Sequence, residues 1–298
     1  MTHIVVLGAR GRLGRALVTE VSSHGIIVTA VSRSPEAVSR STPSVRWESL
    51  APEDSAGHHR LFSTATHVID ARNQRYDNWS QYPKMISHTL QALQGTGARY
   101  LYIDNVYCYG PTGLDAISED APRHPSSSKG KIRLTVEEMV MNAKTIEPVA
   151  TIRLPDFYNI TTDSLSQDRL RWYGDRNLPH QFIHTADAAR AVWQIAIDSR
   201  AYHQIWHVAG APPVSAGDLQ ALARRVLDRP IRLHMISPAM IVLLGLVNRD
   251  ARGFRETRYL WDQPLILDDS KFYHHYGKSE FLTHAQALKD LDRNSAGL

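Results

Sequence analysis

Three glycines near the start of the chain have the spacing of a phosphate-binding turn. Gly8, Gly11 and Gly14 lie between an apolar run at residues 3–7 and a helical pattern at residues 12–21. Glycine allows a tight turn, a close approach of the backbone to a pyrophosphate, and close packing of helix on strand. The amides at the N-terminus of that helix would face the anion. The segment therefore predicts a dinucleotide-binding turn rather than an ordinary strand–helix turn, with these binding residues: Gly8, Arg10, Gly11, Arg12, Leu13 and Gly14.

The end of the next apolar run, at residues 26–31, indicates which dinucleotide would bind. Sites for NAD place an Asp or Glu here, about 20 residues beyond the glycines, to bind the ribose hydroxyls. This chain instead has Ser32, Arg33 and Ser34, so no carboxylate repels a 2′-phosphate. Arg33 can bind that phosphate through two hydrogen bonds. Arg10 or Arg12 could assist, while the other would be a solvated loop charge. We predict NADP(H) in preference to NAD(H).

The elements that position these residues follow from the alternation of apolar runs and helical patterns. Such alternation is typical of a parallel sheet with helices on both faces. We expect strands at 3–7, 26–31, 45–48, 66–71, 99–103 and 148–153, and helices at 12–23, 83–96 and 128–143. The predicted fold class is α/β, a Rossmann-type doubly wound parallel sheet with a smaller substrate lobe.

The alternation weakens after Arg153. Residues 155–179 have an irregular pattern. Further elements are expected as strands at 181–184 and 205–208 and helices at 187–197, 215–227 and 283–291. The dinucleotide-binding core should cover 1–155 and be completed by 181–208, and the substrate lobe should comprise 156–180 and 209–298.

Composition excludes several classes of protein. The 298 residues are 43% hydrophobic and 21% charged, with a net charge of +4 and no block of Lys and Arg, so a nucleic-acid partner is not expected. Cys108 is the only cysteine, which agrees with a reducing compartment. No signal-peptide pattern precedes the first strand, and the apolar stretch at 239–247 is too short to span a bilayer. We expect a cytoplasmic protein that binds a small-molecule substrate and no membrane, and the sequence leaves a homodimer open.

Four motifs occur in the order typical of a known superfamily. They are the glycine segment at 8–14 and the segments 104–110 (Asp-Asn-Val-Tyr-Cys-Tyr-Gly), 153–158 (Arg-Leu-Pro-Asp-Phe-Tyr) and 182–190 (Phe-Ile-His-Thr-Ala-Asp-Ala-Ala-Arg). Together they resemble the extended short-chain dehydrogenase/reductase superfamily, the NAD(P)-dependent epimerase/dehydratase group. The resemblance runs essentially from end to end. It implies a Rossmann fold with a substrate lobe built from the later segments.

The chain departs from that family at the catalytic positions. Asn105 stands where the family has Ser or Thr, while Lys129 and Arg133 take the places of the Tyr and Lys in its Tyr-x-x-x-Lys pair. This is similar to the atypical branch that lacks the catalytic tyrosine. The position of Lys129 implies a proton donor, since an ammonium can replace the phenol. Arg133 could assist it or hold the nicotinamide ribose, and the Asn105 amide could hold a substrate carbonyl. Alternatively, Lys129, Arg133 and Glu137 form a solvent-exposed charge ladder.

Other side chains are weaker candidates for chemistry. Tyr107 and Tyr158 could supply the missing phenol, whereas Tyr109 should have a structural role. His274 and His275 lack further ligands at metal-binding spacing, so no metal site is expected. A structural hydrogen bond is expected for His184. No Gly-x-Ser-x-Gly motif is present, and Cys108 has no nearby histidine in the sequence, which disfavours a hydrolase.

The favoured interpretation is an NADP(H)-dependent oxidoreductase that acts on a carbonyl or an activated double bond of a small organic molecule. Two alternatives remain open at this point. One is a redox sensor that binds NADP(H) without catalysis, and the other is an epimerase or dehydratase that uses the cofactor transiently.

Overall fold

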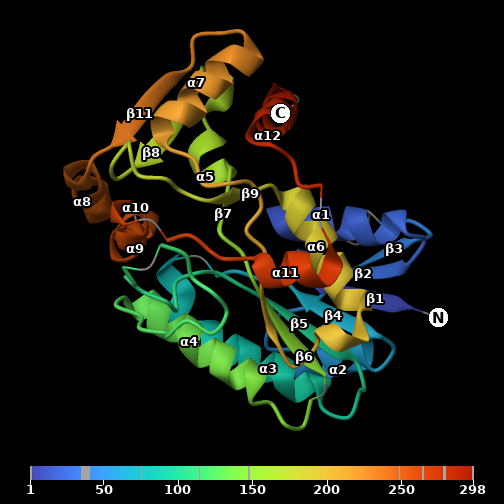
Figure 1. Cartoon of the computed structure of the whole chain (residues 1–298). Coiled ribbons are helices and arrows are strands. Elements are labelled where there is room, and N and C mark those ends of the chain that lie inside the picture. The colour runs from blue at the N-terminus through green and yellow to red at the C-terminus, as the bar shows by residue number, and fades with distance from the viewer. Residues whose placement is uncertain are drawn as a thin grey trace. The chain divides into compact units, whose positions relative to one another are not determined.

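The fold was obtained as a computed structural model that describes residues 2–34, 41–74, 76–113, 115–146, 148–247, 249–263, 265–277 and 280–296 (Figure 1). The chain divides into two compact units. The first comprises Met1–Asp104, Ile132–Arg153 and Ala188–Trp206, and the second comprises Asn105–Lys131, Leu154–Asp187 and His207–Leu298.

The first unit contains a seven-stranded sheet with the order β10-β6-β5-β4-β1-β2-β3. Neighbouring strands from β6 to β3 pair in parallel. The strands are β1 (His3–Leu7), β2 (Ile27–Ser32), β3 (Val45–Ser49), β4 (His67–Asp70), β5 (Arg99–Asp104), β6 (Val149–Arg153) and β10 (Ile205–His207). The first six agree with the predicted strands to within one residue at each end. The predicted doubly wound α/β fold is confirmed.

Helices cover both faces of this sheet. In Figure 1, α1 (Arg12–Ser23) and α6 (Thr185–Ile197) lie on one face, and α2 (Ser55–Phe62), α3 (Tyr82–Leu93) and α4 (Ser128–Met141) lie on the other. Because both faces are covered, the central strands β1 and β4 are mostly apolar, and side chains of the sheet such as Val5 and Leu101 are fully buried. The sequence analysis missed α2, which is short and rich in histidine. The Asp54 carboxylate caps it by accepting from Gly57 N at 2.8 Å. Two 3₁₀ helices, η2 (Tyr76–Gln81) and η4 (Ser199–Ala201), complete the unit.

The parallel register brings the carboxyl ends of the strands to one edge of the sheet. Leu7 pairs with Val31 on one side and with Asp70 on the other. Asp104 pairs with Arg153. The order of strands reverses between β1 and β4, which makes this edge a topological switch point. Ligands of open α/β sheets bind at such points, outside the carboxyl ends of the strands.

The second unit has two small parallel pairs of strands. These are β8 (Arg169–Tyr173) with β11 (Arg232–Ile236), and β7 (Asp156–Phe157) with β9 (Phe182–Ile183). Its helices are α5 (Asn159–Thr162), η3 (Leu165–Gln167), α7 (Ala216–Leu227), α8 (Pro238–Val247), α9 (Arg249–Thr257), α10 (Tyr259–Asp262), α11 (Ser270–Tyr276) and α12 (His284–Ala296). The prediction that 155–179 is irregular is therefore wrong. The strand β8 was missed because it is short and its partner lies about 60 residues further along the chain.

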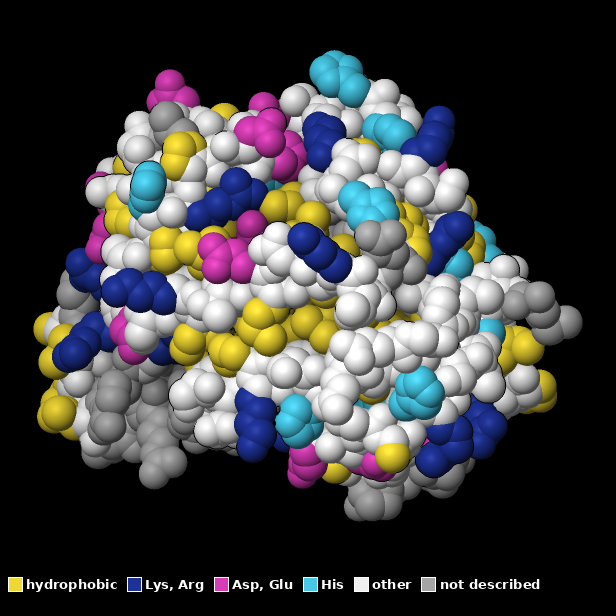
Figure 2. All heavy atoms as spheres, turned by 90° about the horizontal axis from the view of Figure 1, so that it is seen from below, with side chains coloured by type: hydrophobic (Ala, Val, Ile, Leu, Met, Phe, Trp, Pro, Cys, Tyr) yellow, Lys and Arg dark blue, Asp and Glu magenta, His cyan; other side chains and the backbone are white. Residues whose placement is uncertain are grey.

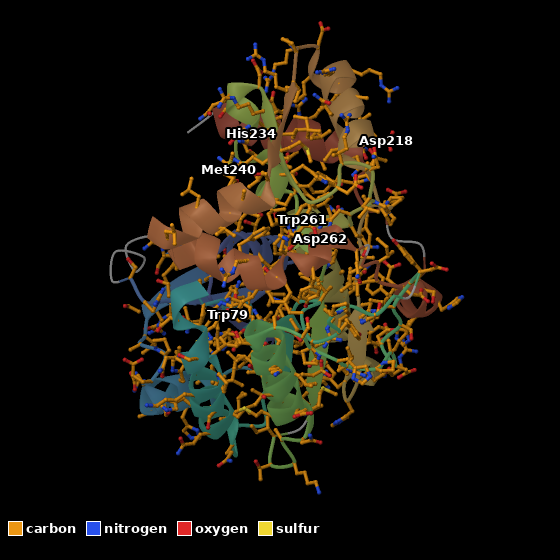
Figure 3. All side chains as sticks on the ribbon, turned by 90° about the vertical axis from the view of Figure 1, so that its left-hand side faces the viewer. Trp79, Asp218, His234, Met240, Trp261 and Asp262 are labelled. Carbon is orange, nitrogen blue, oxygen red and sulfur yellow. The ribbon has the colours of Figure 1, made fainter. Side chains whose placement is uncertain are left out.

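Aromatic side chains pack together inside the second unit. Trp261 of α10 (Figure 3) stacks on His180 with ring centroids 3.8 Å apart, and it meets Trp172 edge to face at 5.2 Å. His180 Nε2 also lies 2.9 Å from an oxygen of Asp156. Such pairs add to the area that each ring buries, so they hold α10 against β8 and β9.

The division into units differs from the predicted one at four segments. Residues 105–131, 154–155, 181–187 and 207–208, expected in the dinucleotide-binding core, belong to the second unit. The reason for 105–131 is that Tyr259 and Glu256 of the second unit hydrogen-bond to Tyr107 and Ser128.

The lengths of the helices and the charges on one face of the surface can be compared with the expectations of no membrane and no nucleic-acid partner. Among the helices that the structure describes, none is long and apolar enough to cross a membrane. On the face drawn in Figure 2, Lys and Arg side chains are interspersed with Asp and Glu and do not gather into one basic patch.

Candidate dinucleotide and active site

The turn after β1 requires its first and third glycines for packing. Gly8 has a φ of +76°, and a Cβ there would lie 3.0 Å from the backbone of Ala71 and Arg72, which follows β4. A Cβ on Gly14 would overlap the carbonyl oxygen of Gly8. The positive φ and both close approaches therefore exclude larger residues. Leu13 is buried beside Gly14 on the inner face of α1, so it packs the helix against the strand.

The second glycine is different, because little of the protein fills the space beside it. A Cβ on Gly11 would approach only the Gly8 oxygen, at 3.1 Å, and Gly11 has an ordinary φ of −64°. In the described part of the chain, no side chain caps α1 and no carboxylate lies in its first turn. The helix thus presents uncapped amides and the positive end of its dipole, which suits a phosphate.

The segment after β2 presents Arg33 to solvent. Ser32 is buried, and its hydroxyl accepts from Ser34 N at 3.2 Å, which closes a small turn around the exposed Arg33. Arg33 has no hydrogen bond or ion pair within the described residues. Arg10 and Arg12 are also exposed, and Arg15 donates to the Arg10 carbonyl at 2.9 Å. Arg10, Arg12 and Arg33 thus place exposed guanidinium groups at this edge of the first unit.

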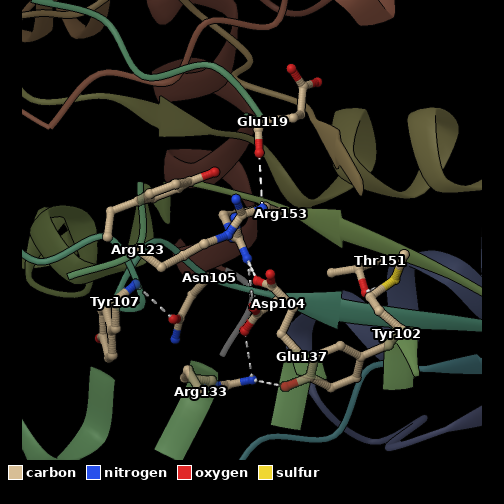
Figure 4. Close-up of polar contacts among 12 residues, drawn as sticks. Tyr102, Asp104, Asn105, Tyr107, Glu119, Arg123, Arg133, Glu137, Thr151 and Arg153 are labelled. Atoms are coloured by element: carbon tan, nitrogen blue, oxygen red, sulfur yellow. Dashed lines mark hydrogen bonds and ion pairs between the residues drawn. The ribbon is translucent and has the colours of Figure 1, made fainter. Parts of the chain in front are cut away.

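Arg133 of α4 lies in a buried polar cluster at the carboxyl ends of β4 and β5 (Figure 4). Its Nη1 donates to the hydroxyls of Tyr102 at 2.6 Å and Tyr82 at 2.9 Å, and lies 3.3 Å from Asp104. Its Nη2 donates to Asn73 at 2.8 Å. Burial opposes the charge, but the two tyrosines and Asp104 outweigh it and raise the pKa of Arg133 above its usual value. Its buried Nε has no partner among the described residues.

The cluster continues through a second buried arginine. Arg153, at the end of β6, donates to Asp104 at 3.2 Å and to Glu137. Two guanidinium groups thus balance two carboxylates, as buried charges require. Lys129, Arg133 and Glu137 are each at most 5% exposed. The alternative that they form a solvent-exposed ladder is therefore wrong.

A second ion pair lies where β4 meets the glycine turn. Arg72 binds Asp70 through Nε at 2.9 Å and Nη2 at 2.5 Å, and Tyr100 donates to the same carboxylate at 2.9 Å. Burial opposes the charge of Arg72, but Asp70 outweighs it and raises the pKa of Arg72. This pair fixes the backbone that packs on Gly8.

In the second unit, Asn105 is held in an orientation that suits a substrate oxygen. Tyr107 N donates to the Asn105 Oδ1 at 3.1 Å (Figure 4). A backbone N–H requires an oxygen acceptor, so this contact assigns the amide. The Nδ2 donor has no partner among the described residues, and Asn105 is only half-buried. Asn105 can therefore donate to a carbonyl oxygen.

Lys129 lies at the start of α4 in the same unit. Ser127 caps the helix, since its hydroxyl accepts from Gly130 N at 3.0 Å. The Lys129 ammonium is buried and lies 3.3 Å from Glu256 Oε1 of α9. An ammonium carries three N–H donors and no acceptor, so the Lys129 side chain can interact only with acceptor atoms.

The tyrosines proposed as replacement phenols are held by other groups. Tyr158 donates to His284 Nδ1 at 2.6 Å, because His284 Nε2 donates to the Pro212 carbonyl. Burial raises the pKa of Tyr158. Tyr107 is buried, and its carbonyl accepts from Tyr259. Tyr109 contacts His207 Nε2 at 2.6 Å, which agrees with a structural role. The Tyr158 hydroxyl is therefore already hydrogen-bonded, whereas the contact with Tyr259 engages only the backbone carbonyl of Tyr107.

His184 and the pair His274 and His275 were the other histidines considered from the sequence. His184 Nδ1 accepts from Ala186 N at 3.3 Å, and Nε2 lies 3.2 Å from Asp290, which confirms the expected structural hydrogen bond. Among the described residues, no group of potential metal ligands includes His274 or His275.

The sequence analysis missed the partners of the candidate residues. Asp104 and Arg153 belong to the motifs that carry the resemblance, and their places at strand ends were a usable signal. Tyr82, Tyr102 and Glu256 gave no such signal, because they lie between 31 and 128 residues from the side chains they contact.

No protein-family model matches the chain, and no curated protein matches it. Solved structures resemble it over its whole length. The enzyme WbmH from Bordetella bronchiseptica, in complex with NAD+, has a TM-score of 0.76 at 18% identity, with 100% of both chains covered. UDP-glucuronic acid 4-epimerase from Bacillus cereus, in complex with UDP-glucuronic acid and NAD, has a TM-score of 0.80 at 13% identity, with 99% of each chain covered.

A third similar structure is dTDP-glucose 4,6-dehydratase from Bacillus anthracis in complex with NAD. It has a TM-score of 0.79 at 11% identity and covers 98% of this chain and 96% of that chain. These likenesses confirm the Rossmann-type fold that the resemblance predicts.

Proposed function

We propose that the protein is an NADP(H)-dependent oxidoreductase acting on a carbonyl or an activated double bond of a small organic molecule. One observation carries the proposal. The glycine turn at the switch point leaves space beside Gly11 and uncapped amides at the start of α1, which is what a dinucleotide pyrophosphate requires.

The residues present fit such a cofactor. Gly8, Gly11 and the first amides of α1 would hold the pyrophosphate. Arg133 would hold the nicotinamide ribose, since its buried Nε is a donor that the described protein atoms do not satisfy. The bound cofactor would supply or accept a hydride.

The 2′-phosphate is assigned to Arg33. Arg33 is exposed, follows a strand that ends in serine, and has no partner among the residues that the structure describes, so it can bind a phosphate through two hydrogen bonds. The three similar structures contain NAD, so the preference for NADP(H) rests on Arg33 alone.

Two residues of the second unit would act on the substrate. Asn105 Nδ2 would donate to the substrate oxygen and orient it. The Lys129 ammonium would give that oxygen a proton: the N–H bond breaks as the O–H bond forms, and solvent later restores the proton. General acid catalysis of this kind contributes about 10²–10⁴-fold.

A second candidate function is favoured by the similar structures. Two of them are an epimerase and a dehydratase of nucleotide sugars. In this alternative, the same site would use the cofactor transiently with no net oxidation or reduction.

Calorimetric titration with NADPH and NADH, followed by turnover assays, tests both candidates. Net oxidation of NADPH with members of a panel of aldehydes, ketones and enones supports the oxidoreductase. Conversion of UDP-glucuronic acid without a net change in cofactor absorbance supports the second candidate. Absence of binding by either dinucleotide would overturn both, and tight binding without any turnover would favour a redox sensor.

A further inference from the structure

The carboxylate of Glu256 contacts the first two residues of α4. The Ser128 hydroxyl donates to Glu256 Oε2, and the Lys129 Nζ lies 3.3 Å from Glu256 Oε1. Each carboxylate oxygen therefore has its own partner. The contact joins α9 to a residue 127 positions earlier in the chain.

This contact offsets an unfavourable placement of the Lys129 charge. The ammonium is buried, and it lies at the N-terminus of a helix, where the helix dipole is positive. Both conditions disfavour a cation. Burial alone would raise the pKa of Glu256, but the Ser128 hydroxyl and the Lys129 charge outweigh it and lower that pKa. The carboxylate is thus ionised at neutral pH and opposes the positive end of the helix.

The same segment also contacts the loop that carries Asn105. Tyr259, three residues after Glu256, donates through its hydroxyl to the Tyr107 carbonyl at 3.2 Å. That carbonyl lies so close to α4 that a Cβ on Gly130 would be 2.5 Å from it. Residues 256–259 therefore contact both the loop after β5 and the start of α4.

We propose that Glu256 is a positioning residue of the candidate site, which holds the Lys129 ammonium at the start of α4 while Tyr259 holds the loop of Asn105. This inference rests on the proposed role of Lys129 as proton donor. Glu256 acts through Lys129 and does not touch the substrate. The negative charge of the Glu256 carboxylate persists through the reaction, because the proton that moves belongs to Lys129 Nζ.

A labelling experiment tests the contact without any substrate. Acetic anhydride acetylates neutral amines, and peptide mass spectrometry reports the rate at Lys129 in the full chain. Glu256→Gln retains side-chain oxygen and nitrogen atoms near Ser128 and removes the charge. We expect Lys129 to react about tenfold faster in this variant, since the charge-assisted contact that holds its ammonium against Glu256 is weakened. Glu138→Gln is the matched control, because Glu138 is exposed on the same helix. Equal labelling rates in the wild type and Glu256→Gln would overturn the inference.

Kinetics then separate this inference from the proposed function. Glu256→Gln should lower kcat with little change in KM for the dinucleotide. Glu256→Asp restores the charge, so it should recover part of both the labelling protection and kcat.

The outcomes can be told apart. If Lys129→Ala abolishes turnover while Glu256→Gln and Glu256→Asp resemble the wild type in both assays, Glu256 has no positioning role and the proposed function stands. If Lys129→Ala retains turnover, the proposed donor is wrong, whereas faster labelling in Glu256→Gln would still establish the contact. A folding defect in Glu256→Gln leaves Glu256→Asp as the deciding variant.

Discussion

The glycine turn and the buried polar cluster are built in opposite ways, although both lie at the carboxyl ends of strands of the same sheet. The turn consists of residues that are neighbours in the sequence, and it works by having no side chains where a ligand or a helix must approach. The cluster joins Arg133 and Arg153 to side chains from several strands and helices. Loss of Gly11 from the turn should therefore affect binding, whereas loss of Arg153 from the cluster should affect folding.

The largest expected effect concerns Lys129, the proposed proton donor, which lies in neither the glycine turn nor the buried polar cluster. Lys129→Ala should lower kcat by about 10²–10⁴-fold, because the proton donor is lost. Dinucleotide affinity measured by calorimetry should be unchanged, since the turn is intact. Lys131→Ala, an exposed lysine on the same helix, is the control and should keep wild-type kcat. Wild-type turnover in Lys129→Ala would remove Lys129 from the mechanism.

The next effect tests the cluster. Arg153→Met leaves the buried carboxylates of Asp104 and Glu137 without their shared cation, and breaking a buried pair in this way costs about 3–5 kcal/mol. Urea denaturation should show that loss in the free energy of unfolding. Arg200→Met removes an exposed partner of Asp198 and should cost less than about 1 kcal/mol. Similar losses in the two variants would mean that the cluster is not a stabilising unit.

A smaller effect tests the dinucleotide preference at the edge of the turn. Arg33→Ala should weaken NADPH by a factor of about 10–100, because a charge-assisted hydrogen bond contributes about 1.5–3 kcal/mol. Binding of NADH should change little, since it lacks the 2′-phosphate. Calorimetric titration of both dinucleotides measures the difference. An equal loss for the two would exclude Arg33 from phosphate recognition.

The smallest effect separates binding from folding within the turn itself. Gly11→Ala should leave the free energy of unfolding within about 0.5 kcal/mol of the wild type, because alanine accepts the φ of −64° and clashes little. Dinucleotide affinity should fall about tenfold, the effect of losing one hydrogen bond to phosphate. Gly14→Ala is the contrast, since its Cβ overlaps the Gly8 oxygen and should destabilise the fold. Unchanged affinity in Gly11→Ala would contradict a pyrophosphate at this position.

The same contrast explains what could be predicted from the sequence. Strands such as β1 and β2 contain apolar runs, and Gly8, Gly11 and Gly14 impose a local backbone requirement, so both features could be predicted from the sequence. The short helix α2 and the strand β8 were missed, because their stability depends on packing and on a distant partner. The motif position of Lys129 was visible, but its carboxylate partner Glu256 was not, since side-chain contacts between distant segments leave no periodic pattern.

The position of Trp79 beside Arg133 has an optical consequence. The buried indole (labelled in Figure 3) lies with the Arg133 guanidinium 4.9 Å from its ring centroid and donates to the Gln74 carbonyl at 2.8 Å. Indole emission overlaps the absorption of a dihydronicotinamide but not that of the oxidised ring. With the nicotinamide ribose at Arg133, Trp79 would transfer its excitation to the reduced cofactor alone. The protein would thus report the redox state of its own cofactor by the colour of its emission.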